Sequence, residues 1–159
     1  FDDKNILQEA LIRSSSVKAN IVMKDELEVG IRSHLNLGHT FAHAIESASQ
    51  YDGTILHGEA VSLGILMAYK TSMMSGICSN EQFNIVDRHF REIGLKRTFG
   101  SLLRKKLNTD LLISLMKNDK KVKHGSINFI IPSKIGDVSI RSDIDHKIIK
   151  SVIDTTLSS

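Results

Sequence analysis

Proline, the residue that most strongly interrupts helices, occurs once in the 159 residues of this chain, and the ten glycines are scattered. Because proline removes a helical hydrogen bond and clashes with the preceding turn, a chain that almost lacks it can form long helices. A hydrophobic content of 41% is enough to bury one core at this length. The sequence therefore predicts a mainly α fold, a multi-helix bundle that forms a single domain over residues 1–159.

Hydrophobic periodicity places the predicted helices along the chain. Apolar residues recur at helical intervals over residues 4–23, and residues 55–74 are apolar or small almost all round, which predicts a central, buried helix. Between them, another helix should carry Asn36, His39 and His43. Further helices are predicted over residues 80–92, 97–107, 109–116 and 144–157.

One short β-hairpin is predicted near the carboxyl end of the chain. Residues 127–131 are strand-like, and residues 132–136 form a turn region that contains the single proline. A second short strand is expected at residues 138–140. The predicted fold is thus a helical bundle with one hairpin.

The charges of the chain argue against several classes of partner. The 21 basic and 18 acidic residues are spread along the sequence, so we expect no nucleic-acid-binding face, whereas small anionic substrates are compatible. Polar residues inside segment 55–74 argue against a membrane span, and no secretory signal is recognised. The single Cys78 is expected to be a small buried residue in a reducing cytoplasm. Because the chain begins FDDKN without methionine, we expect it to be a piece of a longer protein.

Histidines in the segment RSHLNLGHTFAHAIESASQYDGTILHGE are the strongest candidates for chemistry. His39 and His43 are four residues apart, so on a helix they share a face, with Asn36 one turn before. His39 and His57 each neighbour a glycine and are the preferred zinc ligands. His43 could be a ligand or a proton-transfer group. Hydrogen-bonded core histidines are the alternative, but the spacing favours a site.

Basic side chains could bind an anionic substrate beside these histidines. Arg32 precedes Asn36 by one predicted helical turn and offers a planar donor fork suited to carboxylate or phosphate, although it could instead be a surface residue paired with Glu28. On composition alone, the other candidate lysines would be surface residues. They are Lys18, Lys117, Lys120, Lys121 and Lys123.

Two glutamates could complete a metal site or support it. Glu46 is as easily a residue of the helix surface, whereas Glu59 is expected to orient a histidine. The sequence contains neither GxGxxG nor GxxxxGK[ST]. We therefore do not expect this chain to hold a nucleotide by itself.

Three longer blocks carry a family resemblance. They are VKANIVMKDELEVGIRSHLNLGHTFAHAIE, LHGEAVSLGILMA and MKNDKKVKHGSINFIIPSKIG, which together span most of the chain. In content and order they closely resemble the carboxyl-terminal half of the 3-dehydroquinate synthase family, for which LNLGHTFAHAIE with LHGEAV is a highly specific signature. Ala42 departs from the family's usual glycine by one methyl group, which we expect to be tolerated.

The resemblance implies a function and its cofactors. Enzymes of this family convert 3-deoxy-D-arabino-heptulosonate 7-phosphate to 3-dehydroquinate and phosphate, a lyase reaction of the shikimate pathway of aromatic amino-acid biosynthesis. They use a divalent metal, zinc or cobalt, and bound NAD. By resemblance, this chain would be the helical metal- and substrate-binding domain of a cytoplasmic, homo-oligomeric enzyme. Its partners would be a phosphorylated sugar acid and its own amino-terminal domain.

The resemblance also assigns roles to individual residues. The implied metal ligands are His39 and His57. The implied proton-transfer residues are His43 and Glu28. The implied substrate-binding residues are Lys18, Arg32, Asn36, His39, His57 and Lys120, with Lys121 as the alternative to Lys120.

The family has parts that this chain is not expected to supply. In the family, a glutamate upstream of the Lys18 block is the third metal ligand, and an amino-terminal Rossmann-like domain binds NAD. Only 17 residues precede Lys18 here, so we expect the isolated chain to be inactive and to bind zinc weakly or not at all. The alternatives are another sugar phosphate cyclase, an iron-dependent alcohol or glycerol dehydrogenase-like domain, and a stand-alone, non-catalytic interaction module.

Overall fold

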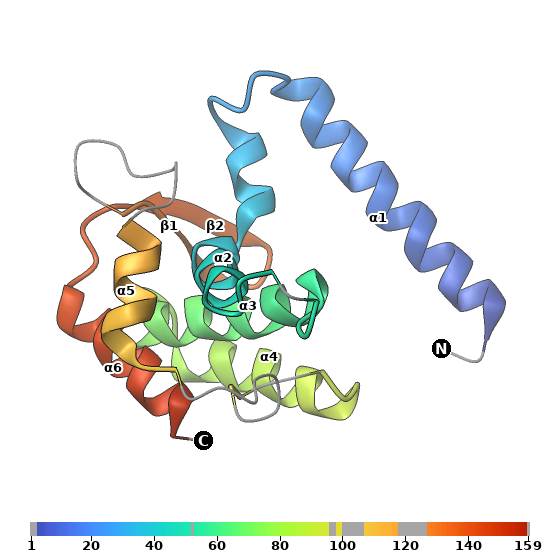
Figure 1. Ribbon diagram of the computed structural model, residues 1–159. Coiled ribbons are helices and arrows are strands. Elements are labelled where there is room, and N and C mark those ends of the chain that lie inside the picture. The colour runs from blue at the N-terminus through green and yellow to red at the C-terminus, as the bar shows by residue number, and fades with distance from the viewer. Residues whose placement is uncertain (1–2, 52, 96–97, 100–106, 118–126, 159) are drawn as a thin grey trace. The chain divides into compact units, whose positions relative to one another are not determined.

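The computed structural model describes residues 3–51, 53–95, 98–99, 107–117 and 127–158. These residues form helices and one two-stranded antiparallel sheet, which confirms the predicted mainly α fold with a hairpin (Figure 1). The chain divides into two compact units, Phe1–Asn36 and Leu37–Ser159. Nowhere in the described ranges is a helix both long and apolar enough to cross a membrane.

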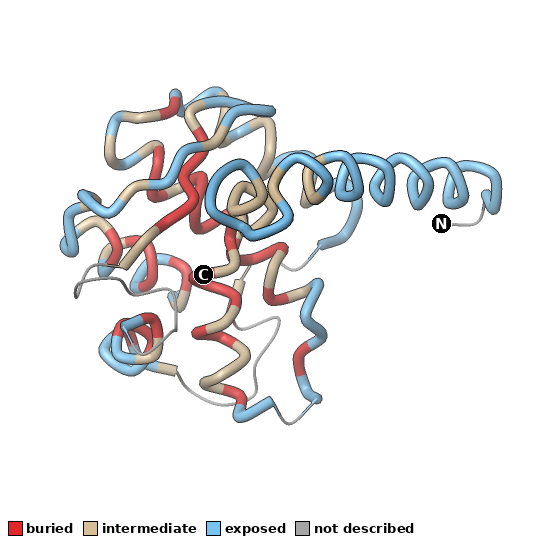
Figure 2. The backbone as a smooth tube through the Cα atoms, turned by 90° about the horizontal axis from the view of Figure 1, so that it is seen from above, coloured by how far each residue is buried: buried red, intermediate tan, exposed pale blue. Residues whose placement is uncertain are grey.

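The first unit consists of a long helix, a turn and a short 3-10 helix. Helix α1 (Lys4–Lys24) confirms the prediction for residues 4–23, and its first turn is capped by Asp3, whose carboxylate accepts from the amides of Asn5 and Ile6. No residue of α1, all of which the structure describes, is buried (Figure 2). The 3-10 helix η1 (Ile31–Asn36) ends the unit.

The second unit is built around helix α3. Its elements in order are α2 (His39–Ala48), α3 (His57–Met74), α4 (Asn80–Glu92), α5 (Thr109–Lys117), β1 (Phe129–Lys134), β2 (Asp137–Arg141) and α6 (His146–Leu157). Helix α3 contacts α2, α4, α6 and β1. More than half of its residues are buried, which confirms the prediction of a central, buried helix over residues 55–74.

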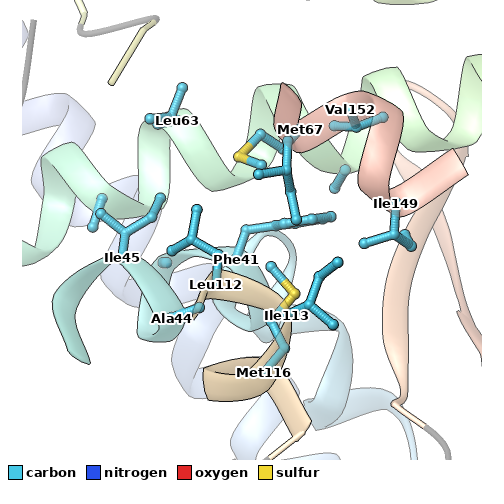
Figure 3. Packing of buried hydrophobic residues seen from close by; sticks show 14 of the residues in the cluster. Phe41, Ala44, Ile45, Leu63, Met67, Leu112, Ile113, Met116, Ile149 and Val152 are labelled. Atoms are coloured by element: carbon cyan, nitrogen blue, oxygen red, sulfur yellow. The ribbon is translucent and has the colours of Figure 1, made fainter. Parts of the chain in front are cut away.

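The core of this unit joins side chains from four helices and the hairpin. Phe41 of α2 and Phe129 of β1 have ring centroids 5.5 Å apart. Leu63 and Met67 of α3 and Met116 of α5 belong to the same buried cluster (Figure 3). Each of these five side chains is buried, and burial of apolar side chains of this kind is the dominant favourable term in folding.

The hairpin is bound to the helices through its carbonyl groups as well as its side chains. The hydroxyl of Thr40 in α2 donates to the carbonyl of Asn128 at 3.2 Å, and the hydroxyl of Ser72 in α3 donates to the carbonyl of Pro132. Strand β1 continues through Pro132 to Lys134, so the turn begins later than predicted. The strand tolerates this proline at an irregularity in its pairing with β2.

Three other predicted helices can be compared with the structure. Helix α4 confirms residues 80–92, α5 confirms residues 109–116, and α6 confirms residues 144–157 to within two residues. The helix predicted over residues 97–107 lies mostly outside the described residues. Cys78 is buried, as expected.

One helix prediction is wrong. A single helix was expected to carry Asn36, His39 and His43, but the chain forms η1 up to Asn36 and starts α2 only at His39. Between them Gly38 has φ +79°, a left-handed conformation that no continuous right-handed helix contains. The expected stripe from Arg32 through Asn36 to the two histidines is therefore broken at Gly38.

Candidate functional site

A close backbone contact fixes where α2 begins. A Cβ added at Gly64 in α3 would lie 2.2 Å from the carbonyl oxygen of Gly38, and one added at Gly38 would lie 2.5 Å from the amide nitrogen of Ile65. Only glycine at both positions lets the two backbones approach this closely. Since His39 is the first residue of α2, this contact sets the position of its imidazole relative to α3.

The structure brings three of the predicted site histidines together. The rings of His39 and His43, one turn apart on α2, have centroids 5.6 Å apart. The ring of His57, the first residue of α3, has its centroid 5.4 Å from that of His39. The starts of α2 and α3, with one turn of α2, thus bring the imidazoles of His43 and His57 close to that of His39.

Hydrogen bonds define the tautomers of two of these imidazoles. Nδ1 of His57 lies 3.0 Å from Oε1 of Glu46, and Nδ1 of His39 lies 3.3 Å from the carbonyl oxygen of Leu37. An ionised carboxylate and a carbonyl can only accept hydrogen bonds, so each Nδ1 carries the hydrogen. In the neutral ring, this leaves the lone pair on Nε2, the nitrogen that can bind a metal.

The two glutamates make contacts that differ from those expected. Oε2 of Glu59 accepts from the amide of Leu56 at 3.1 Å, so Glu59 caps the start of α3, and the expectation that it orients a histidine is wrong. The carboxylate that lies at hydrogen-bond distance from His57 is that of Glu46. The signal in the sequence was its spacing: Glu46 follows His39 by seven residues and His43 by three, which places all three on one face of a helix.

A second group of predicted site residues lies within the unit Phe1–Asn36. The side-chain amide of Asn36 donates to Oε1 of Glu28 at 2.8 Å, and Nε of Arg32 lies 3.9 Å from Oε2 of the same carboxylate. Nη1 of Arg32 donates to the carbonyl of Glu26 at 2.6 Å. The structure therefore brings Glu28, Arg32 and Asn36 together, and it contains the Arg32–Glu28 pair that was the alternative interpretation of Arg32.

Asp25, which sequence reasoning did not select, organises this group. Its carboxylate accepts from the backbone amides of Val29 at 3.0 Å, Gly30 at 2.8 Å and Arg32 at 2.9 Å. The hydrogen bond from the Arg32 amide is the main cause that lowers the pKa of Asp25 below its usual 3.8. The turn that Asp25 closes holds Glu28 at φ +56°, a conformation that non-glycine residues rarely adopt. An acidic residue directly after a helix was the available signal.

The remaining predicted site residues are lysines. Lys18 lies exposed on α1. Lys120, with its alternative Lys121, lies outside the described residues. Among the residues that the structure describes, no group of three or more His, Cys, Asp and Glu side chains could hold a metal ion. Within the described part of the chain, the predicted metal ligands His39 and His57 thus form a pair without a third His, Cys, Asp or Glu side chain that would complete a site.

Known proteins resemble this chain in sequence. The family described as 3-dehydroquinate synthase C-terminal matches residues 1–122. The 3-dehydroquinate synthase of Ruegeria pomeroyi is 39% identical over 151 residues, which are 95% of this chain and 41% of that protein. The enzyme of the same name from Jannaschia sp. is 38% identical over 156 residues, 98% of this chain and 42% of that protein. The chain thus spans about two fifths of the length of these relatives.

Solved structures share the fold. A 2-epi-5-epi-valiolone synthase from Streptomyces hygroscopicus, with NAD+ and Zn2+ bound, has a TM-score of 0.76 and 21% identity over 95% of this chain and 40% of its own. A 2-deoxy-scyllo-inosose synthase complexed with carbaglucose-6-phosphate, NAD+ and Co2+ has a TM-score of 0.73 and 22% identity over 89% of this chain and 40% of its own. On its sequence, this chain belongs to the 3-dehydroquinate synthase C-terminal family.

Proposed function

We propose that this chain is the metal- and substrate-binding part of a 3-dehydroquinate synthase, which converts 3-deoxy-D-arabino-heptulosonate 7-phosphate to 3-dehydroquinate and phosphate. The observation that carries this proposal is the His39–His57 pair, in which each Nδ1 is directed to an acceptor and each Nε2 keeps its lone pair. Relatives at 38–39% identity that bear this enzyme's name favour it over other sugar phosphate cyclases, whose solved structures are 21–22% identical.

The two imidazoles fit a divalent metal of the zinc type. Two rings bound through Nε2 to one zinc at ~2.1 Å, with a tetrahedral angle between them, have centroids about 5 Å apart. The centroids of His39 and His57 are 5.4 Å apart, close to that value. His39 and His43 are at a similar 5.6 Å, so the distance alone does not choose the pair. The resemblance to the 3-dehydroquinate synthase family, which assigns the metal to His39 and His57 and proton transfer to His43, favours the first pair, and the contacts of both Nδ1 atoms are compatible with it.

The chain's own residues supply charge and proton transfer. When bound, the metal acts as a Lewis acid toward the hydroxyl groups of the substrate. His43 lies one helical turn from His39, within range to move a proton to or from a group held there. Glu28, oriented by the amide of Asn36, is the second proton-transfer group.

Cationic side chains of the chain are proposed to bind the anionic ends of the substrate. Arg32 donates one of its five N–H groups to the carbonyl of Glu26 and forms an ion pair with Glu28 at 3.9 Å, which leaves donors for a carboxylate or phosphate. Lys18 and Lys120, or Lys121 as the alternative, are proposed to add positive charge. NAD, which supplies hydride transfer, is proposed to be bound by an amino-terminal domain, and a glutamate upstream of the Lys18 block is proposed to be the third metal ligand.

The test compares the isolated chain with the full-length gene product. With the heptulosonate phosphate, NAD and Zn2+, the full-length protein should release phosphate and form 3-dehydroquinate, and His57→Ala should abolish both. The isolated chain should form no product above background. The proposal is wrong if the full-length protein leaves this substrate unchanged but cyclises another sugar phosphate or oxidises a simple polyol.

A further inference from the structure

We propose that Glu46 is a positioning residue that holds His57 in the orientation and tautomer needed to bind the metal. This inference rests on the proposed function, because it assumes that His57 is a metal ligand. Glu46 itself is not proposed to contact metal or substrate. Its effect is transmitted through the imidazole of His57.

The geometry makes Glu46 the contact that fixes His57. The side chain of His57 is 59% exposed to solvent, so packing against neighbours restrains it little. The side chain of Glu46 is only 13% exposed, and its Oε1 lies 3.0 Å from Nδ1 of His57. A ring that is mostly exposed to solvent is therefore contacted at one nitrogen by a carboxylate that is largely buried.

The burial of Glu46 needs an explanation that a surface residue would not need. Withdrawing an ionised carboxylate from water costs free energy unless donors replace the lost hydration. In the described structure the side chain that donates to this carboxylate is His57. The hydrogen bond joins the last turns of α2 to the first residue of α3, so it ties together the two helices that carry His39 and His57.

The chemistry of the pair matches what a ligating histidine requires. Donation from Nδ1–H to a carboxylate keeps the lone pair on Nε2 and makes that nitrogen more basic. Removal of such a partner from a metal-bound histidine typically weakens metal affinity about 10- to 100-fold. Glu46 is thus expected to affect the metal affinity of the site and the tautomer of His57.

Metal affinity of the full-length protein provides the first measurement. Zn2+ binding, measured in competition with a chromophoric chelator, should weaken about 10- to 100-fold in Glu46→Ala. Glu46→Gln, which retains an acceptor oxygen without the charge, should fall between Glu46→Ala and the wild type. Glu59→Gln is the matched control, because it removes the same charge near the start of α3 but leaves His57 and its partner unchanged. It should bind Zn2+ within about twofold of the wild type.

A second measurement does not involve metal. In the metal-free protein, 15N NMR of the imidazoles should report the Nδ1–H tautomer for His57 in the wild type and in Glu59→Gln. Glu46→Ala should shift the ring toward the Nε2–H tautomer. A variant that had merely lost stability would broaden many signals instead of changing the tautomer of one histidine.

The outcomes separate this inference from the proposed function. If the wild type binds Zn2+ and His57→Ala abolishes binding, but Glu46→Ala binds as tightly as the wild type, the positioning role is wrong and the metal site stands. If the wild-type protein binds no Zn2+, or if His57→Ala binds it unchanged, the proposed metal site fails and the inference fails with it.

Discussion

Replacing Gly64 with alanine tests how closely α2 must approach α3. The new Cβ would lie 2.2 Å from the carbonyl oxygen of Gly38, whereas ordinary van der Waals contact begins at 3.4 Å. It would also lie 3.1 Å from the carbonyl carbon of Gly38 and 3.2 Å from the amide nitrogen of Ala42. All three atoms belong to the backbone, so no side-chain rotation can relieve the overlap. The helices must move apart by about 1 Å.

The expected loss of stability follows from two opposing effects. Overpacking of this kind costs about 3 kcal/mol, the upper end of the usual range, because rigid backbone has to move. The intrinsic preference of alanine over glycine in a helix returns at most about 1 kcal/mol. The net destabilisation of Gly64→Ala is then about 2 kcal/mol or more, which lowers the Tm by roughly 4–8 °C for a protein of this size.

Gly58, near the start of the same helix, provides the control. An added Cβ there would meet nothing within 4 Å. Gly58→Ala should therefore leave stability unchanged or raise it by up to about 1 kcal/mol. Thermal unfolding followed by circular dichroism, with denaturant titrations for the free energies, measures both variants. A Gly64→Ala protein at least as stable as Gly58→Ala would refute the argument that the two backbones are in contact.

Three further predictions concern other parts of the chain. Because hydrogen bonds lower the pKa of Asp25, its stabilisation of the turn is complete above the unfolded-state pKa near 3.8 and is lost as the pH falls through the lower folded-state pKa. The amide chemical shifts of Val29 and Gly30 should therefore titrate with a midpoint below 3.8. Asp25→Asn should remove that transition. Asn36→Asp replaces the donor of the 2.8 Å hydrogen bond to Glu28 with a second carboxylate, which repels the first. The kcat/KM of the full-length enzyme should therefore fall at least ~10-fold. A variant with unchanged kcat/KM would exclude a role for this contact. Met116→Ala empties a fully buried position and should lower the free energy of unfolding by about 2–5 kcal/mol in denaturant titrations; a loss below 1 kcal/mol would contradict its place in the core.

The helices could be predicted where local signals agree. Helix α4 has an apolar stripe, a Ser79 cap whose hydroxyl accepts from the amide of Gln82, and Gly94 at φ +74° just beyond its end. Each of these signals is contained in a few consecutive residues. The bounds of that helix were accordingly read correctly from the sequence.

Features set by tertiary contacts could not be predicted in the same way. The start of α2 depends on Gly38 lying against Gly64, a residue 26 positions away, so the periodic pattern suggested a continuous helix. The two glutamates pose the same problem. Glu59 lies closer to His57 in sequence, but the crossing of α2 and α3 brings Glu46 to its ring. The roles of the site residues stay predictions, including that of Lys120, outside the described residues.

The attachment of the hairpin to the helices bears on how molecules of this protein associate. A two-stranded sheet has backbone groups at its edges that can pair with a strand from another molecule. Here the hydroxyls of Thr40 and Ser72 donate hydrogen bonds to the carbonyl oxygens of Asn128 and Pro132, and Pro132 has no amide hydrogen that could donate. Another strand cannot use these groups without displacing helix side chains. The β1 edge of the hairpin is thereby less available to an intermolecular sheet, a safeguard against aggregation supplied by two hydroxyls and one imino acid.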